Sequence, residues 1–412
     1  MIVFGQTYIP QGLNSCIIVL QFLTQLLHLT DQLGFKKISA EEQADKRYRH
    51  FSARTQLFTM VFAQLTKQNS LRSIEHAISS DNDLYHAGIT AKITRTNLAH
   101  ANEYRPSIIF EKFYFHVLKY YTKLVNKPVN IFGKHTKLID ATTISLNIKQ
   151  YKWAKFRSTK SGIKIHTRFD YEANCADYLF ITNAKEHENN TLKNMHLTKQ
   201  DIAVFDRGYF NKKQFYEFTK SEISFVTRLK SNVIYTVVDR YAVSGHENDT
   251  YKIISDEKIT LNVSISKKKE SVVTLRKIIS KDLQSKKKIV LLTNLFEIDS
   301  LEVAELYKKR WTIELFFKMI KQNLKIKKFY GHSENAVKTQ IWIAVITHML
   351  FLILQAETNY RQRSFSYFCS EISVVLFLHR SLKKWFCGDH EKPVPKLIHH
   401  PNTSELSQKP PS

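Results

Sequence analysis

The order of β-rich and helical segments between residues 137 and 229 constrains the fold of this chain more than any other feature. Short runs of β-branched and aromatic residues predict strands, and polar segments with helical spacing separate the later ones. In chain order, the sequence predicts strands at 137–146, 163–170 and 178–183, a helix at 189–197, a strand at 202–205, a helix at 212–219 and a strand at 223–229. The order three strands, helix, strand, helix, strand predicts a mixed α/β core.

This order is what a ribonuclease-H-like mixed sheet requires. We therefore predict an α/β fold with a ribonuclease-H-like mixed sheet, a β-rich insertion and a helical N-terminal domain. The insertion is predicted from alternating β-branched and polar residues, and it holds 14 basic and 7 acidic residues between Arg228 and Lys288, a net charge of +7. The predicted units are residues 1–130, 131–229, 230–288, 289–365 and 366–412, the last comprising a C-terminal helix and a disordered tail.

The first 130 residues are predicted to be helical. Apolar residues recur at three- and four-residue spacing from Phe51 to Ile78, and a polar break at residues 67–70 divides this stretch into two short helices. A basic segment from Lys92 to Arg105 follows. A helix-turn-helix that reads DNA and a plain helical bundle both fit this pattern, because only contacts in a DNA groove define the former.

Two apolar runs resemble membrane segments in composition. The run at residues 16–29 contains two Gln and a His, and no Lys or Arg precedes it. The run at residues 341–354 is shorter than the roughly 18 to 20 residues that span a bilayer. We interpret both runs as buried helices and expect no membrane partner.

The charge of the chain points to a polyanionic partner. The sequence has 62 Lys and Arg against 37 Asp and Glu, which gives a net charge of +25. Its four cysteines lie far apart and form no CxxC pair, so neither a zinc knuckle nor a disulfide framework is predicted. A reduced, cytosolic compartment fits this cysteine usage best.

Three acidic residues stand out by their positions. Asp140 lies in the first β run, Asp206 follows a later strand, and Glu314 lies in a helical segment. Carboxylates from neighbouring strands and a packed helix can converge and hold two Mg²⁺ ions, which activate a water or a 3′-hydroxyl for phosphodiester cleavage. Taken singly, Asp206 fits an ordinary helix N-cap and Glu314 a solvated helix residue. The predicted strand order favours the metal site for the three together.

Polar residues around Glu314 form a pattern of their own. On one continuous helix, Tyr307, Arg310, Glu314 and Lys321 share a stripe about 60° wide beside an apolar stripe. Arg and Lys beside a metal-binding Glu are suited to grip phosphates, and Tyr adds a hydroxyl donor. The alternative is an ordinary salt-bridged face, since Arg310 and Glu314 are four residues apart.

These motifs resemble the insertion-sequence-4 type of bacterial transposases, a branch of the DDE transposases. The spacing of Tyr307, Arg310, Glu314 and Lys321 matches the YREK signature of that branch. LIDATTI around Asp140 and FDRGYF around Asp206 are similar to its first and second acidic blocks, and the residues between them and Glu314 leave room for the β insertion. The resemblance covers residues 40–360.

The resemblance implies a DNA transposase that uses Mg²⁺ for strand cleavage and strand transfer at element ends. It implies a catalytic and metal-binding triad of Asp140, Asp206 and Glu314, two Mg²⁺ ions with Mn²⁺ as a substitute, and DNA contacts from Tyr307, Arg310 and Lys321. Arg207 is a candidate for a further phosphate contact. The implied partners are double-stranded DNA, as terminal inverted repeats and target, and a second copy of the chain in a synaptic homodimer. The expected location is the bacterial cytoplasm, in association with the nucleoid.

One feature departs from the family pattern. Members of this branch use a Trp in the β insertion to hold a flipped base, and here no Trp lies between Trp153 and Trp311. Tyr235, Tyr241 and Tyr251 are the alternative stacking side chains.

Two further segments are candidates for function. Basic residues interleave with aromatic ones after Asp140, a composition typical of a surface that follows a nucleic-acid strand. The predicted DNA-binding residues of this segment are Lys149, Lys152, Trp153, Lys155, Arg157 and Lys160. The pair His187 and Glu188 follows the third strand, where a solvated loop is the favoured interpretation and a role near the metals the alternative.

Two other functions remain open from the sequence. One is a transposase-derived DNA-binding protein without catalysis, and the other is a structure-selective nuclease on the same fold. Loss of cleavage on replacing Glu314 by Gln would exclude the first, and strand joining to a second DNA would exclude the other.

Overall fold

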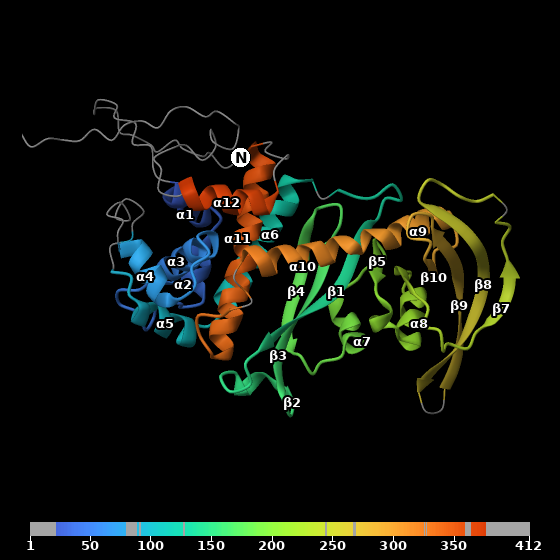
Figure 1. Ribbon diagram of the computed structural model, residues 1–412, viewed down its shortest axis with the longest axis horizontal. Coiled ribbons are helices and arrows are strands. Elements are labelled where there is room, and N and C mark those ends of the chain that lie inside the picture. Colours follow the sequence, from blue (N-terminus) through green and yellow to red (C-terminus); the bar gives the residue numbers. More distant parts are fainter. Residues whose placement is uncertain are drawn as a thin grey trace, which may run out of the picture.

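The computed structural model describes residues 22–375, except for 80–88, 90, 91, 127, 244, 267, 268, 325, 327 and 359–363. The predicted tail beyond residue 375 and the first residues of the apolar run at 16–29 lie outside the described residues. A helical region forms one end of the molecule and a β-rich extension the other, with the predicted mixed sheet between them (Figure 1).

The helices are numbered in chain order: α1 Phe22–Gln32, α2 Phe35–Glu41, α3 Ala53–Leu65, α4 Leu71–Ser79, α5 Arg95–Tyr104, α6 Ile108–Leu124, α7 Glu188–Thr191, α8 Lys212–Lys220, α9 Ser300–Lys309, α10 Trp311–Asn323, α11 Glu334–Thr358 and α12 Phe365–Val375. Short 3₁₀ turns lie at Lys152–Ala154, Leu192–Met195 and Arg207–Tyr209.

The strands are β1 His135–Leu146, β2 Lys155–Arg157, β3 Lys160–Asp170, β4 Cys175–Asn183, β5 Asp201–Phe205, β6 Ser224–Arg228, β7 Thr236–Arg240, β8 Tyr251–Ser266, β9 Lys269–Asp282 and β10 Lys288–Thr293. The strand β2 was not predicted from the sequence. The predicted helix at 189–197 is a single α-helical turn, α7, followed by a 3₁₀ turn.

The sheet has the order that the sequence predicts for a ribonuclease-H-like fold. β1 pairs antiparallel with β3, and β3 pairs antiparallel with β4. On its other side β1 pairs parallel with β5, which pairs parallel with β6. The sheet continues through β10, β9, β8 and β7, all antiparallel to their neighbours. The predicted fold class is therefore confirmed, and the β-rich extension adds its strands to the same sheet.

The two faces of the sheet are covered by different layers. Leu138 and Val204 belong to a core shared with α9, α10 and the N-terminal helices. Ile139 and Phe205 belong to a second core with α8 and the strands β8 and β9. Because side chains alternate along a strand, residue 140 of β1 lies on the face that α9 and α10 cover.

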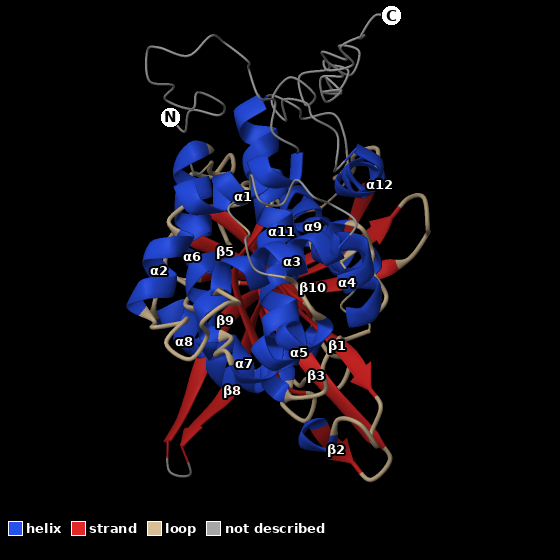
Figure 2. Ribbon diagram, turned by 90° about the vertical axis from the view of Figure 1, so that its left-hand side faces the viewer, coloured by secondary structure: helices blue, strands red, loops and turns tan. Residues whose placement is uncertain are grey.

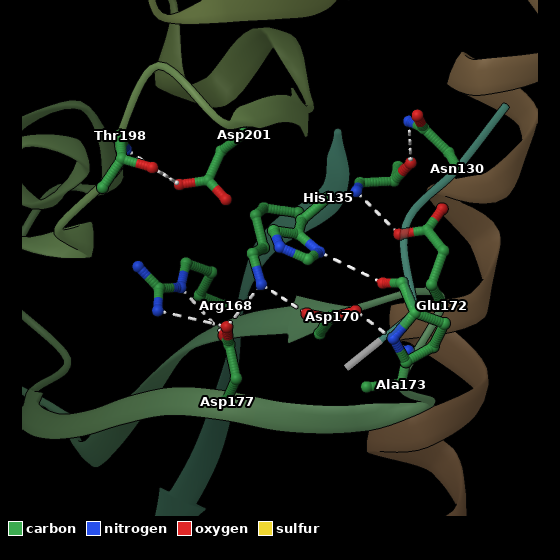
Figure 3. A network of polar contacts seen from close by, with 12 residues as sticks. Asn130, His135, Arg168, Asp170, Glu172, Ala173, Asp177, Thr198 and Asp201 are labelled. Carbon is green, nitrogen blue, oxygen red and sulfur yellow. Dashed lines mark hydrogen bonds and ion pairs between the residues drawn. The ribbon is translucent and has the colours of Figure 1, made fainter. Parts of the chain in front are cut away.

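A buried ionic network anchors the start of β1. Lys137 of β1 is 2 % exposed and donates to Asp170 of β3 at 2.5 Å and to Asp177 of β4 at 2.6 Å. Arg168 of β3 donates to the same Asp177 at 2.8 Å (Figure 3). Paired charges of this kind satisfy one another in the low-dielectric interior. The network therefore fixes β1 relative to its two antiparallel neighbours.

The helix α11 packs with the N-terminal helices α3, α5 and α6, rather than with the sheet. The sequence places it in the same unit as the Glu314 helix, but its apolar residues surround the helix, which requires neighbours on all sides. Among the described residues, one helix, Glu334–Glu357, is long and apolar enough to span a membrane, and 94 % of its most apolar window is buried inside the protein. It is longer than the apolar run at 341–354.

Arg105 serves the interior of the helical region. The sequence places it at the end of a basic segment that could face DNA, but its side chain is fully buried. It donates to the side chain of Gln56 at 2.7 Å and to the carbonyl oxygen of Phe51 at 2.6 Å, and it pairs with Asp45 at 3.1 Å. Arg105 therefore joins α5 to the segment before α3 and is not available to DNA.

Two β extensions project from the same side of the molecule. One is the end of β3 with β2, and the other is the long antiparallel pair β8 and β9 (Figures 1 and 2). Lys155, Arg157 and Lys160 of the first extension are exposed. This arrangement places positive charge on an arm that stands away from the core.

Candidate active site

Asp140 and Asp206 come together because their strands are parallel neighbours. The parallel pairing of β1 with β5 ends at Ile139 and Phe205; Asp140 is the next residue of β1, and Asp206 is the residue directly after β5. Neighbouring strands lie about 4.8 Å apart, so the two carboxylates leave the sheet side by side. Asp206 has extended backbone angles and precedes the 3₁₀ turn at Arg207–Tyr209. Asp140 and Asp206 therefore form what we call the acidic edge, at the point where the pairing of β1 with β5 ends.

Glu314 reaches the same edge from α10, which packs against β1. Its carboxylate oxygen Oε1 lies 2.6 Å from Nη2 of Arg310, and Nη1 of Arg310 lies 3.8 Å from Oδ2 of Asp140. The guanidinium of Arg310 thus lies between the carboxylates of Asp140 and Glu314. Asp140 of β1 and Glu314 of α10 are therefore brought together around the guanidinium of Arg310.

The segment that carries the YREK residues is two helices, not the one continuous helix that the sequence predicts. α9 ends at Lys309 and α10 begins at Trp311. Arg310 between them keeps helical backbone angles, and its N–H donates to the carbonyl oxygen of Tyr307 at 3.1 Å, three residues back. The interruption is one tight turn, so Arg310 and Glu314 still meet.

Burial raises the pKa of Asp140 to about 6. The N–H of Ala141, which donates to Asp140 at 2.8 Å, and the charge of Arg310 both act to lower this pKa, whereas Glu188 and Glu314 act to raise it. The positive charge near the Asp140 carboxylate is therefore too small to offset its burial and the two neighbouring acids. A bound cation would favour its ionised form.

The other two YREK residues contact protein atoms. Tyr307 is 8 % exposed, and the guanidinium carbon of Arg310 lies 5.8 Å from the centre of its ring. Nζ of Lys321 donates to the carbonyl oxygen of Thr143 at 3.2 Å, which links α10 to β1 beyond Asp140. The ring of Tyr307 therefore packs against the guanidinium of Arg310, and Lys321 lies on the same side of the sheet as Asp140.

Arg207 is exposed and lines an open pocket of about 490 Å³. Asp206, Gly208 and Glu188 line the same pocket, together with residues 230–232 after β6. The pocket adjoins the acidic edge and is polar. It offers both a guanidinium and carboxylates to a ligand.

The predicted DNA-binding residues after β1 comprise exposed basic side chains and one aromatic side chain that contacts the protein. Lys149, Lys152, Lys155, Arg157 and Lys160 are exposed, as a DNA-facing surface requires. The indole N–H of Trp153 donates to the carbonyl oxygen of His332 at 2.7 Å, so this aromatic residue anchors the segment to the loop before α11. Their DNA contacts stay a prediction.

The tyrosines of the insertion are engaged with neighbouring side chains. Tyr251 is 5 % exposed, and Tyr235 accepts a hydrogen bond from Lys277 at 2.9 Å. Tyr241 lies over Arg276, 5.5 Å from the guanidinium carbon to the ring centre. By contrast, Trp311 at the start of α10 is 58 % exposed. Trp311 is therefore an exposed aromatic residue next to Arg310 in the sequence. It is not among the predicted DNA-binding residues.

Glu188 is the acidic residue to which the sequence analysis gave little weight. It begins α7, after the four residues that follow the end of β4, and it lines the pocket that holds Asp206. Its position after the third strand of the sheet was the available signal, because strand order brings the ends of β4 and β5 toward the same region.

The acids fit a divalent cation by their chemistry, since carboxylate oxygens are the ligands that Mg²⁺ prefers. Among the residues that the structure describes, no three acidic, histidine or cysteine side chains are already close enough to hold a metal ion. Arg310 takes the place of a cation between Asp140 and Glu314. Binding of one cation by these carboxylates would therefore require their side chains to move closer together.

The chain matches two known families. Residues 132–350 match the transposase DDE domain, which covers more than half of the chain and whose members generally use divalent metal ions. Residues 20–90 match a domain of unknown function, DUF4372.

Curated relatives are described as putative or probable transposases. The chain is 33 % identical over 217 residues to putative transposase y4zB of Sinorhizobium fredii, which is 53 % of this chain and 60 % of that protein. It is 25 % identical over 230 residues to the probable transposase for insertion sequence element IS5377 of Geobacillus stearothermophilus, which is 55 % of this chain and 59 % of that protein. The matched regions thus span about 60 % of these relatives.

A solved structure is also similar, at lower resemblance. It is the synaptic complex of the piggyBac transposase with hairpin DNA, with a TM-score of 0.42 and 11 % identity, covering 91 % of this chain and 82 % of that chain.

Proposed function

Because the chain belongs to the transposase DDE domain family, we propose that it cleaves DNA at the ends of a bacterial insertion sequence and joins the released ends to target DNA. The observation that carries this proposal is that Asp140 and Asp206 follow the last paired residues of two parallel strands, while Arg310 pairs with Glu314 of α10 and lies 3.8 Å from Asp140. Within the family, the YREK spacing favours the insertion-sequence-4 type.

Asp140, Asp206 and Glu314 would hold two Mg²⁺ ions, for which Mn²⁺ would substitute. Bound in this way, the ions supply an activated water for the first cleavage, an activated 3′-hydroxyl for strand transfer, and charge stabilisation for the leaving oxygen. Asp140 lies within β1, where it pairs with Thr167 of β3, and Asp206 follows the last paired residue of β5, so their backbones need little reorganisation. Glu314 is held by Arg310, which must release it, at least in part, when the ions bind.

The basic side chains around the acids would hold the DNA backbone. Arg310, once released, and the exposed Arg207 are the groups best placed to grip phosphates beside the cleaved bond. The exposed lysines and arginine of the segment from 149 to 160 extend this positive surface away from the acids. Such a surface predicts a steep salt dependence, with a slope of about −0.9 for each phosphate contact.

The DNA partners would be the terminal inverted repeats of the element and a target duplex. Two copies of the chain would pair the two ends, and the protein would act in the bacterial cytoplasm on the nucleoid. The match to the transposase DDE domain supports DNA as the partner.

A cleavage assay tests the proposed function. The substrate is DNA carrying the inverted repeats that bracket the gene, incubated with Mg²⁺ and the full chain. We expect cleavage and strand joining by wild type, loss of both in Glu314→Gln with DNA binding retained, and normal activity in Glu305→Gln, a matched substitution on α9. Binding without cleavage by wild type would favour a DNA-binding protein, and cleavage without joining would favour a nuclease.

A further inference from the structure

A fourth acidic side chain belongs to the acidic edge. Glu188 lines the same pocket as Asp206, and its negative charge acts on Asp140. Glu188 comes from α7, after β4, whereas the three acids of the proposed triad come from β1, from the end of β5 and from α10. The pocket is therefore lined by carboxylates from elements that only the folded sheet brings together.

The backbone beside Asp206 is shaped around the carboxylate of Glu188. A Cβ atom at Gly208 would lie 2.7 Å from Oε2 of Glu188, closer than real Cβ contacts. The absence of a side chain at position 208 thus lets Glu188 approach the chain two residues after Asp206. Its other oxygen, Oε1, lies 3.3 Å from Nζ of Lys164, which also donates to the carbonyl oxygen of Glu186 at 3.0 Å.

An orphaned hydroxyl among these acids points to a ligand. The Tyr209 side chain is fully buried, and its hydroxyl has no hydrogen-bond partner among the residues that the structure describes. Burial raises the pKa of Tyr209 well above its ordinary value, and the charges of Asp140, Glu188 and Asp206 act in the same direction. A buried hydroxyl without a partner is unfavourable and calls for an explanation such as a water or an ion.

We propose that Glu188 is a fourth carboxylate ligand of the divalent-cation site, and that the Tyr209 hydroxyl is a positioning group that hydrogen-bonds water held there. The inference rests on the proposed function, because it assumes that the acidic edge binds a divalent cation. Lys164 then has the role that Arg310 has for Glu314: it pairs with the carboxylate and is exchanged for the cation. Because Gly208 has no side chain, the Glu188 carboxylate has room beside it.

The test is Mn²⁺ binding to the full chain without DNA, followed by the electron paramagnetic resonance signal of free Mn²⁺. We expect Glu188→Gln to weaken binding at least tenfold. Tyr209→Phe should weaken it by about tenfold, the low end of the effect of groups that orient metal ligands. Glu186→Gln is the matched control in the same loop and should bind as wild type does.

Two variants separate a ligand from a structural partner of Lys164. Gly208→Ala changes no charge but shifts the end of the flexible Glu188 side chain, and it should weaken Mn²⁺ binding by less than Glu188→Gln does. Lys164→Gln removes a competing cation and should leave Mn²⁺ binding unchanged or tighter. Loss of binding in Lys164→Gln, in a protein that melts at the temperature of wild type, would overturn the proposal, since Glu188 would then matter only through that ion pair.

The outcomes also separate this inference from the proposed function. Asp206→Asn should abolish Mn²⁺ binding. If it does so while Glu188→Gln binds as wild type does, the fourth ligand is refuted and the triad stands. If wild type binds no Mn²⁺ and does not cleave DNA with Mg²⁺, the proposed function itself fails.

Discussion

Asp140 and Asp206 lie side by side at the point where the parallel pairing of β1 with β5 ends. Each is the residue after the last pair, Ile139 with Phe205. The distance between neighbouring strands, about 4.8 Å, therefore sets the separation of these acids at the backbone. The hydrogen bonds between the two strands end directly before both acids, so the paired strands fix where each acid begins.

Arg310 competes with metal for the acids that it joins. Its guanidinium pairs with Glu314 at 2.6 Å and lies 3.8 Å from Asp140. Arg310→Gln removes both a competitor and a positive charge, so we expect Mn²⁺ to bind the DNA-free protein about tenfold more tightly, a gain of roughly 1.4 kcal/mol. Cleavage should nevertheless fall, because a phosphate contact is lost. Lys318→Gln, an exposed change on the same helix, is the control for Mn²⁺ titration. Weaker Mn²⁺ binding in Arg310→Gln would show that Arg310 organises the acids instead.

Lys137 is expected to be essential for the stability of the sheet. Lys137→Met leaves the carboxylates of Asp170 and Asp177 without their shared cation, and breaking a buried pair in this way costs about 3 to 5 kcal/mol. Urea unfolding should show this loss, whereas Lys149→Met, at an exposed position, should change the unfolding free energy by less than about 0.5 kcal/mol. A loss below about 1 kcal/mol for Lys137→Met would mean that the network is open to water.

The pH dependence of stability is expected to include His166. Burial, with a smaller effect from the Lys164 charge, lowers the pKa of His166 to about 4, against an ordinary value of 6.5. The unfolded chain therefore holds the proton more strongly, and His166 contributes stability that is complete above about pH 6.5 and is lost as the pH falls toward 4. From near pH 7 to near pH 4.5 the loss is about 2 kcal/mol. In urea unfolding at the two pH values, His166→Gln should lack this part of the loss, and the exposed His76→Gln should keep it. Identical pH dependence in His166→Gln and wild type would contradict the assignment.

Trp311 is expected to stack on DNA next to the acids. It is 58 % exposed and adjoins Arg310, whereas Tyr235 and Tyr251 in the insertion are engaged with the protein. Stacking on a base contributes about 1 to 3 kcal/mol, so Trp311→Ala should weaken binding of a DNA end by roughly 5- to 150-fold. Trp311→Phe should retain most of the affinity. Leu315→Ala, also exposed on α10, is the control, and equal affinities for Trp311→Ala and wild type would refute the contact.

The sequence was sufficient for the order of strands around the acids. Alternation of apolar and polar residues in β1, β3 and β4, followed by alternating strands and helices, leaves few sheets into which the chain can fold. Asp140 and Asp206 could be selected because each follows an apolar strand segment.

Contacts between distant segments could not be predicted in the same way. Arg105 reads as one of several basic residues, and only the folded chain brings Asp45 and Gln56 to its guanidinium. The burial of Tyr307 depends on how α9 lies on the sheet. Glu188 reads as a loop residue, because its approach to Gly208 depends on the path of two separate turns. The spacing of apolar residues within one segment does not indicate which distant segment its side chains will contact.

The most direct test of the central claim replaces Asp206 by Cys. A thiolate is a soft ligand that binds Mg²⁺ poorly and accepts Mn²⁺ more readily. We predict that Asp206→Cys fails to cleave terminal-repeat DNA with Mg²⁺ and regains part of its activity with Mn²⁺, whereas Asp206→Ala is inactive with both ions. Cleavage by Asp206→Cys with Mg²⁺ at the rate of wild type would contradict a metal site where the pairing of β1 with β5 ends.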